Sequence, residues 1–494
     1  MPGLLGLAGR GAAPAGLLHA HRRGHAPAHP AAGGLAVTAA REASRPKVVI
    51  VGAGPAGMRA AETLVGAGLH PVIIDEGARA GGQIYRRPPE GFTRSPEQLY
   101  GSEAAKARAL HALFDRMAAD GLLTHHPRRS VVAVRDGQLH VLAENGVQAI
   151  GYDRLILATG ASDRVAPVPG WQSAGVYSLG AAQIALKAQG VALGRRIVLM
   201  GTGPLLTLVG AQLLKAGAQV AAVLDTSPWH QQMKGLPGLA ARPAVMLRGL
   251  VLRARLGTRY RAGVVLERIE TDPDGPVAVR WRDSGGRENR TECDMVGMGW
   301  HLRAETHLAD LTGCAFSYDR QWHQWLPQAD RLGRAGNGIY LAGDGVRLLG
   351  ADGAETAGRL AAAACLADLG RQAPAVDAGL RELARLERFA RGVSRAFPWP
   401  AAMTRGLPDD TIVCRCENVT AGMVRASVAL GGGEANRVKS LSRLGMGRCQ
   451  GRYCQLAGAD LVAAQAGCSP DAVGRFRGQA PVRPTPIGAL LHEG

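Results

Sequence analysis

The stretch VVIVGAGPAG, residues 48–57, decides the fold of this chain of 494 residues. Its four apolar residues predict a buried strand, and the glycines that follow have the spacing of a dinucleotide-binding turn that opens a helix. Gly52 permits the tight turn, Gly54 lets backbone N–H groups approach a pyrophosphate, and Gly57 permits close packing of helix on strand. The stretch therefore predicts the start of a nucleotide-binding βαβ unit.

The unit continues as a helix and a second strand, PVIID at residues 71–75. Pro55 and Ala56 begin the helix, whose N-terminus carries a partial positive charge that attracts phosphate. Asp75, with Glu76 beside it, follows the turn at roughly the 20-residue distance of a ribose-binding acid. We therefore expect both acids to lie beside a ribose.

A second βαβ unit spans residues 197–225, as IVLM, GTGPLL, a helix and QVAAVLD. It keeps Gly201 and Gly203, but Leu206 stands where the third glycine or an alanine belongs. Asp225, at the end of its second strand, is in position to hold a ribose diol. The sequence leaves open a purely structural lobe and a site for NAD or another adenine nucleotide.

Four of the eight cysteines gather near the C-terminus, as CxC at Cys414 and Cys416 and CxxxxC at Cys449 and Cys454. Paired zinc ligands are usually separated by about two to four residues, so this pattern fits a [2Fe–2S] cluster better, with zinc as the alternative. Neighbouring arginines and glycines provide positive charge and close backbone amides, which tune such clusters. We predict that all four thiols bind the cluster.

Three more segments, GGQ at 81–83, ATG at 158–160 and GD at 343–344, follow in the order seen in two-dinucleotide-binding-domain flavoproteins. The chain thus resembles the glutathione and thioredoxin reductase superfamily, which implies FAD on the first glycine loop. It lacks the close cysteine pair that a disulfide reductase needs beside its flavin. The further residues that this resemblance assigns to FAD are Gly82, Gln83, Thr159, Gly160, Gly343 and Asp344.

The combination of GGQIYR, CRCE, GMGRCQGRYC and a late PVRP, over residues 46–490, resembles a narrower family. This is the α subunit of heteromeric opine oxidases and of amino-acid and hydroxyproline dehydrogenases, a group that includes the larger flavoprotein subunit of hydrogen cyanide synthase. The cysteine segment is similar to the [2Fe–2S] domain of the bacterioferritin-associated ferredoxin type.

The resemblance implies an FAD-dependent oxidoreductase acting on CH–NH or CH–NH2 donors as part of a complex. The chain is then the flavin and iron–sulfur electron-transfer subunit of a dye-linked dehydrogenase that oxidises an opine, an amino acid or a cyclic imino acid. The implied partners are a smaller β flavoprotein subunit of the D-amino-acid or glycine-oxidase type and a quinone or redox protein, rather than O2, as electron acceptor. The alternatives are a stand-alone NADH-dependent ferredoxin-type reductase and the large flavoprotein of hydrogen cyanide synthase.

We expect an α/β fold with two Rossmann-type lobes and a small helical C-terminal domain. The expected divisions are a disordered extension at 1–45, an FAD domain at 46–165 and 301–370, an NAD-like Rossmann domain at 166–300, a helical linker at 371–410, a [2Fe–2S] domain at 411–468 and an extended tail at 469–494.

The formal net charge of +18 raises nucleic acid as a ligand, but aromatic residues make up only 4% of the chain. Without aromatic side chains interleaved in a basic patch, we predict no nucleic-acid ligand. No stretch approaches the roughly 20 apolar residues of a membrane-spanning helix, so we expect a cytoplasmic protein and leave open a peripheral position at the inner membrane. The pair His125 and His126, just before PRR, predicts a loop, and no catalytic acid–base constellation is evident.

Overall fold

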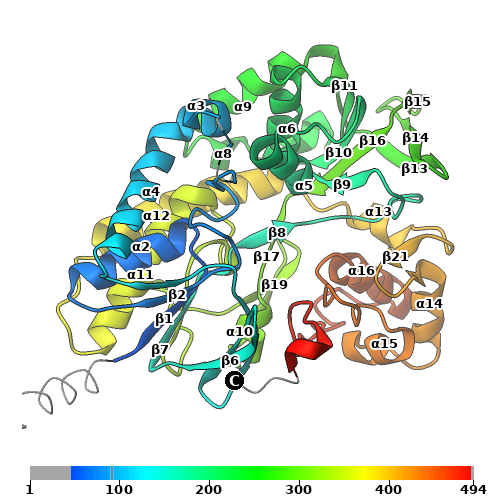
Figure 1. Cartoon of the computed structure of the whole chain (residues 1–494). Helices are drawn as coiled ribbons and strands as arrows, with labels where there is room; N and C mark the ends of the chain where they lie inside the picture. The colour runs from blue at the N-terminus through cyan, green and yellow to red at the C-terminus, as the bar shows by residue number, and fades with distance from the viewer. Residues whose placement is uncertain (1–45, 90, 93, 491–494) are drawn as a thin grey trace, which may run out of the picture. The chain divides into compact units, whose positions relative to one another are not determined.

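The computed structural model describes residues 46–89, 91–92 and 94–490, and the expected extension at 1–45 lies outside these ranges. Its first lobe is built on a parallel sheet with strand order β20–β7–β1–β2–β3, of which β7, β1 and β2 are labelled in Figure 1. The sheet strands are β1 (Val48–Val51), β2 (Val72–Ile74), β3 (Thr124–His126), β7 (Arg154–Leu157) and β20 (Ile339–Leu341). An antiparallel meander consists of β4 (Ser130–Arg135), β5 (Gln138–Ala143) and β6 (Gly146–Gly151). The other elements are α2 (Pro55–Gly66), α3 (Pro96–Tyr100), α4 (Ala104–Ala119), α10 (His307–Leu311), α11 (Gly350–Asp368) and the hairpin β18 (Phe316–Asp319) with β19 (Gln324–Pro327).

The apolar strand β1 serves two cores because successive side chains point to opposite faces of a sheet. Val48 and Ile50 belong to the core that includes residues of α2, α4 and α11. Val49 and Val51 belong to the core that includes residues of the meander and α10. Burial on both faces is what a run of four apolar residues in a parallel strand requires.

The second lobe repeats this plan around a parallel sheet with strand order β12–β11–β10–β16–β9. Its strands are β9 (Val176–Ser178), β10 (Arg196–Thr202), β11 (Gln219–Asp225), β12 (Tyr260–Ala262) and β16 (Met295–Trp300). A second meander consists of β13 (Val265–Asp272), β14 (Gly275–Arg282) and β15 (Glu288–Glu292). Its helices are α5 (Leu179–Ile184), α6 (Pro204–Lys215), α7 (Trp229–Met233), α8 (Leu236–Leu239) and α9 (Pro243–Leu256). The two lobes confirm the predicted α/β architecture of Rossmann type.

An antiparallel pair of short strands, β8 (Ala161–Asp163) and β17 (Leu302–Ala304), joins the lobes. β8 follows the ATG segment directly and β17 follows β16, so the chain leaves and re-enters the first lobe at one place. Residues of β17 therefore lie near the carboxyl ends of the first sheet.

The C-terminal part is helical and includes the cysteine-rich domain, by which we mean residues 411–468 (Figure 1). Its elements, with the two helices before them, are α12 (Asp377–Ala396), α13 (Ala401–Arg405), β21 (Ile412–Cys414), β22 (Val419–Thr420), α14 (Ala421–Ala429), α15 (Ala435–Ser442) and α16 (Gln455–Ala466). Val413 and Leu461 of this domain share one core with Val198 and Met200 of β10. The domain is therefore packed against the second lobe.

Between α16 and Leu490, the last described residue, the chain runs back to the first lobe without a further strand or α-helix. Val482 is buried, and its N–H donates to the carbonyl oxygen of Val132 in β4 at 2.8 Å. A 3-10 turn at Ile487–Leu490 then lies beside β6.

The loop predicted at His125 and His126 is wrong, because both residues belong to β3, the edge strand that pairs with β2. Within the described ranges, no helix is long and apolar enough to cross a membrane.

Candidate functional site

The turn from β1 into the first residues of α2 leaves no room for side chains at two glycines. Gly52 has a φ of +106°, and a Cβ atom there would lie 2.3 Å from the carbonyl oxygen of Ala158. A Cβ atom at Gly57 would lie 1.8 Å from the carbonyl oxygen of Gly52. Helix α2 begins at Pro55 with no side-chain cap and no acidic residue in its first turn. Its positive end therefore faces a position suited to a phosphate.

The GGQ segment lies directly against this loop. A Cβ atom at Gly82, where φ is +61°, would lie 2.8 Å from the Cα atom of Gly54. The N–H of Gly81 donates to the carbonyl oxygen of Ala53 at 2.9 Å. Gln83 is exposed at the rim. The glycines thus allow two backbone segments to approach more closely than side chains would permit.

The ATG and GD segments reach the same place from β7 and β20. A Cβ atom at Gly343 would lie 3.0 Å from the Cβ atom of Ala56. One at Gly345 would lie 2.8 Å from Oγ1 of Thr159, the residue before Gly160. Asp344 accepts two backbone N–H groups at the start of α11, and burial raises the pKa of its carboxyl group. The four predicted segments therefore meet at the carboxyl ends of the central strands, where open α/β sheets bind ligands.

Asp75 is held by the loop that it follows. Its carboxylate accepts the N–H groups of Ala53 and Gly77, each at 2.6 Å, while burial raises its pKa. Glu76 is half-exposed and pairs with Arg483 of the C-terminal tail. Asp75 thus shapes the loop, and Glu76 remains closer to solvent.

The second glycine loop is occupied by a side chain of its own lobe. A Cβ atom at Gly203, where φ is +99°, would lie 2.8 to 3.1 Å from the ring atoms of His301. The Nε2 atom of His301 lies 2.7 Å from the carbonyl oxygen of Phe397, which holds the ring there. Gly201 is closed from another side, since a Cβ atom there would lie 1.8 Å from the carbonyl oxygen of Gly299.

Asp225 is fully buried at 0% exposure. Its carboxylate accepts the hydroxyl groups of Thr202 and Tyr260, each at 2.6 Å, and the N–H of Ser227 at 2.8 Å. Burial raises its pKa to about 6, although these hydrogen bonds favour the ionised form. The carboxylate is directed to interior groups rather than to a ribose diol, so the geometry favours a structural role for the lobe.

The four clustered cysteines lie together as two pairs. The thiol of Cys414, at the end of β21, is hydrogen-bonded to that of Cys454, just before α16, and Cys416 is hydrogen-bonded to Cys449. The Cys454 thiol, with nearby backbone N–H groups, lowers the pKa of Cys414 to about 6. The spacing along the chain does not reveal how the thiols pair, because the fold of the domain sets the pairing.

Glycines bring the backbone close to these thiols. A Cβ atom at Gly447 would lie 2.3 Å from the Cβ atom of Cys416. At Gly445, where φ is +80°, a Cβ atom would lie 3.9 Å from the sulfur of Cys454. Arg415, between two of the cysteines, stacks over the Trp171 ring at 4.8 Å.

Glu305, which the sequence motifs do not predict, links the two candidate sites. Its N–H donates to the carbonyl oxygen of Gly160 at 2.9 Å, and its carbonyl oxygen accepts the Thr159 hydroxyl group at 2.7 Å. Its carboxylate accepts Nε of Arg452 at 2.6 Å, and Arg452 also donates to the carbonyl oxygen of Cys449 at 3.0 Å. One residue therefore contacts both the ATG segment and the cysteine-rich domain.

The Glu305 carboxylate is buried among basic side chains. Nδ1 of His307 lies 2.8 Å away, and Nη1 of Arg483 lies 3.3 Å away. Burial opposes ionisation, but the hydrogen bond and charge of His307, with the charges of Arg303 and Arg483, lower the pKa of Glu305 to about 2. The only sequence signal for this residue is the alternation of basic and acidic residues in HLRAETH after a buried strand.

Family models match two parts of the chain. Residues 46–366 match the pyridine nucleotide-disulphide oxidoreductase model, and residues 409–492 match the sarcosine oxidase A3 domain. The first match covers both Rossmann-type lobes, and the second begins at the cysteine-rich domain and extends through the tail.

Two curated relatives match across nearly the whole chain. The A subunit of the opine oxidase of Rhizobium meliloti is 36% identical over 466 residues, covering 90% of this chain and 86% of that protein. Hydrogen cyanide synthase subunit HcnB of Pseudomonas aeruginosa is 32% identical over 471 residues, covering 90% and 98%. Among solved structures, an L-proline dehydrogenase from P. horikoshii has the same fold, with a TM-score of 0.64, 20% identity, and coverage of 90% of this chain and 79% of that one.

Proposed function

Because the chain belongs to the pyridine nucleotide-disulphide oxidoreductase family, in the group that includes the A subunit of opine oxidase, we propose that it is the flavin and iron–sulfur subunit of a heteromeric enzyme. The family and fold establish a flavin-dependent oxidoreductase subunit of the amino-acid oxidase type. Our further proposal is that the complex oxidises the CH–NH or CH–NH2 bond of an opine, an amino acid or a cyclic imino acid of the proline or hydroxyproline type.

The meeting of four glycine-containing segments at the carboxyl ends of the first sheet supports FAD there. Bound FAD accepts two electrons and releases them singly. The chain's own contribution is to hold the pyrophosphate on the α2 N-terminus and, through its glycines, to bring the four backbone segments together beside the cofactor. The residues that we propose for this site are Gly52, Gly54, Pro55, Ala56, Gly57, Asp75, Glu76, Gly82, Gln83, Thr159, Gly160, Gly343 and Asp344.

The arrangement of thiols supports a [2Fe–2S] cluster over zinc. The CxC and CxxxxC spacing differs from the two to four residues that usually separate paired zinc ligands. All four thiols act on one another's ionisation, with Cys414 beside Cys454 and Cys416 beside Cys449, and two irons need two thiolates each. A bound cluster carries single electrons.

The observation that carries the proposal is the Glu305 link between the candidate sites. It connects Thr159 and Gly160 on one side with Arg452 and the Cys449 carbonyl oxygen on the other. Such a buried, fully paired contact fixes the two sites at one separation, which electron transfer between cofactors requires.

The curated relatives are named as subunits, which supports a complex of several chains. We propose a smaller β flavoprotein subunit of the D-amino-acid or glycine-oxidase type, which holds the amine substrate, and a quinone or redox protein as electron acceptor. A cytoplasmic enzyme that contacts the inner membrane peripherally would suit a quinone.

Co-expression with the product of the adjacent gene tests the proposal. We expect a yellow-brown complex that reduces a dye with opines, proline, hydroxyproline or sarcosine and gives the electron paramagnetic resonance signal of a [2Fe–2S] centre after reduction. A colourless, zinc-loaded chain that co-purifies with no flavoprotein would overturn it.

Gly57→Ala should remove the flavin. The added Cβ atom meets the Gly52 carbonyl oxygen at 1.8 Å, and such overpacking costs about 1–3 kcal/mol or more while displacing the pyrophosphate loop. Gly66→Ala in the same helix is the control, because its Cβ atom meets nothing within 4 Å and alanine is favoured there by up to about 1 kcal/mol. The flavin-to-protein absorbance ratio measures the effect. Equal flavin content in the two variants would contradict this assignment.

Hydrogen cyanide synthase is the second candidate, favoured by the relative of 32% identity. Including glycine in the dye-reduction screen separates this candidate from the opine or amino-acid dehydrogenase. If glycine is the one substrate that is oxidised, and cyanide is released, the complex is a hydrogen cyanide synthase.

NADH should fail to bleach the flavin of the purified chain. His301 covers Gly203 and Asp225 is buried, so the second lobe offers no open ribose or pyrophosphate site. This argues against a stand-alone NADH-dependent reductase and against NAD bound at Gly201, Gly203 and Asp225. Anaerobic stopped-flow mixing with NADH measures the loss of flavin absorbance. Rapid and complete bleaching would support the NADH-dependent reductase instead.

A further inference from the structure

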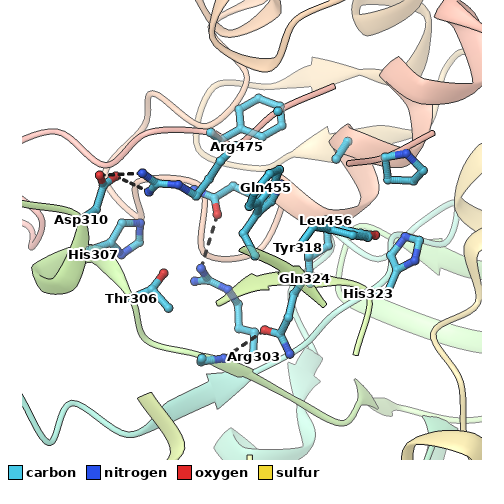
Figure 2. Close-up of a pocket in the computed structure, with 16 residues that line it drawn as sticks. Arg303, Thr306, His307, Asp310, Tyr318, His323, Gln324, Gln455, Leu456 and Arg475 are labelled. Atoms are coloured by element: carbon cyan, nitrogen blue, oxygen red, sulfur yellow. Dashed lines mark hydrogen bonds and ion pairs between the residues drawn. The ribbon is translucent and has the colours of Figure 1, made fainter. Parts of the chain in front are cut away.

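A cavity of about 40 Å³ lies between the first lobe and the C-terminal part of the chain (Figure 2). β17 and the β18–β19 hairpin form one wall, while α16 and the residues after it form the other. Neither the proposed flavin residues nor the four clustered cysteines line it. The side chains that matter here are Arg303, Asp310, Tyr318, Gln324, Trp325 and Gln455.

Four hydrogen-bond donors in the wall of this cavity have no partner among the described residues. They are Nη1 of Arg303, the hydroxyl group of Tyr318, Nε2 of Gln324 and Nε1 of Trp325. Arg303 and Gln324 are 5% and 4% exposed, so bulk water does not satisfy them. An unmade hydrogen bond of a buried group costs roughly 1–3 kcal/mol. Four such donors around one space indicate a missing acceptor.

The Arg303 guanidinium group in the wall of the cavity also lacks an ion pair within the described part of the chain. Arg303 has no carboxylate within ion-pair distance among the described residues, and its one side-chain hydrogen bond is to Gln455 at 3.4 Å. The Asp310 carboxylate in the same wall is already paired with Arg475 at 2.6 Å and Arg477 at 3.0 Å. In the described ranges Arg303 therefore lacks a direct ion pair, and a buried cation in that position is stabilised by an anion in contact with it.

The other titratable groups nearby are committed elsewhere. His307 faces Glu305, which Arg452 and Arg483 also contact. His323 faces Asp460 at 2.7 Å. The Glu305 charge acts on Arg303 without a direct ion pair and is shared with Arg452 and Arg483, so three arginines face this one carboxylate.

We propose that this cavity binds one small monovalent anion, of the size of a halide or formate, with Arg303 as its counter-ion. An anion accepts from all four donors at once, whereas a water molecule must also donate, and the Tyr318 hydroxyl oxygen is the one unpartnered acceptor that these four groups offer it. The volume holds roughly one or two water-sized species, whose share of liquid volume is about 30 Å³. The anion contacts both walls of the cavity, and it therefore stabilises the packing of the C-terminal part of the chain against the first lobe. This inference does not rest on the proposed electron-transfer function.

Thermal unfolding of the as-purified protein in sodium bromide and in sodium gluconate, at equal ionic strength, tests the proposal. We expect the melting temperature to rise saturably with bromide and a bromide anomalous-scattering peak beside Arg303 in crystals. Arg303→Met should abolish the bromide-specific rise, and Arg331→Met, at an exposed arginine, should preserve it. A rise of the same size in gluconate, or an empty cavity in the crystal, would overturn the proposal.

Tyr318→Phe keeps the test decisive if Arg303→Met does not fold. Removing an unpartnered buried hydroxyl group should leave the protein at least as stable in gluconate. In bromide, the lost charge-assisted hydrogen bond should weaken the apparent bromide affinity by roughly tenfold. An unchanged bromide affinity would show that the donors do not bind the anion together.

Discussion

Replacing Cys449 by serine should abolish the iron–sulfur absorption and the electron paramagnetic resonance signal of the reduced protein while the flavin stays bound. Cys449 and Cys416 form one of two thiol pairs, so losing one thiol leaves one iron with an incomplete ligand set. The proposed flavin segments are separate from the thiols, which is why flavin content should not change. Substrate-dependent dye reduction by the complex should fall to background.

The control is Cys468→Ser, because Cys468 is an exposed thiol just after α16 and outside the pairs. Its variant should keep both spectra and the activity. Iron content, flavin content and spectra should be measured on both variants. Bound zinc in the wild type, or an unchanged iron signal in Cys449→Ser, would refute the cluster.

Replacing Glu305 by alanine should destabilise the protein by about 3–5 kcal/mol, the usual cost of removing one partner of a buried ion pair. The change would leave Arg452, whose side chain is 10% exposed, without its carboxylate. It would also remove the side chain that joins the proposed flavin and cluster sites. Urea unfolding followed by circular dichroism measures the loss.

Glu292→Ala is the matched control, since this glutamate also pairs with an arginine, Arg196, but its side chain is 59% exposed. Exposed pairs contribute about 1 kcal/mol or less. Equal losses in the two variants would show that the Glu305 pairs do not stabilise the fold.

The Glu305 carboxylate also predicts that the unfolding free energy falls at acidic pH. The pKa of Glu305 is lowered from 4.5 to about 2 in the folded chain. A lowered folded-state pKa gives stability that is fully present above the unfolded value and is lost as the pH falls toward the folded one. Between those pH values the wild type should therefore lose more unfolding free energy than Glu305→Gln, and parallel pH profiles would contradict this.

The sequence predicted the first lobe well because its signals are local. A buried parallel strand needs an apolar run, and the turn after it needs glycine, so VVIVGAGPAG specified β1, the loop and the start of α2. The edge strand at His125 and His126 was missed because an edge position tolerates polar residues and loses the apolar signal. The third helix of the cysteine-rich domain, α16, also went unpredicted, since its small residues gave no clear apolar stripe.

By itself, then, the sequence determined the two Rossmann-type lobes and the residues able to serve as ligands, because backbone conformation and donor chemistry are properties of residue types and their spacing. Only the tertiary structure decided how those residues are used. It paired Cys414 with Cys454, put His301 over Gly203 and buried Asp225, and it brought Glu305 between segments more than a hundred residues apart. The physical reason is that burial and pairing of polar groups depend on contacts across the fold, which no local pattern records.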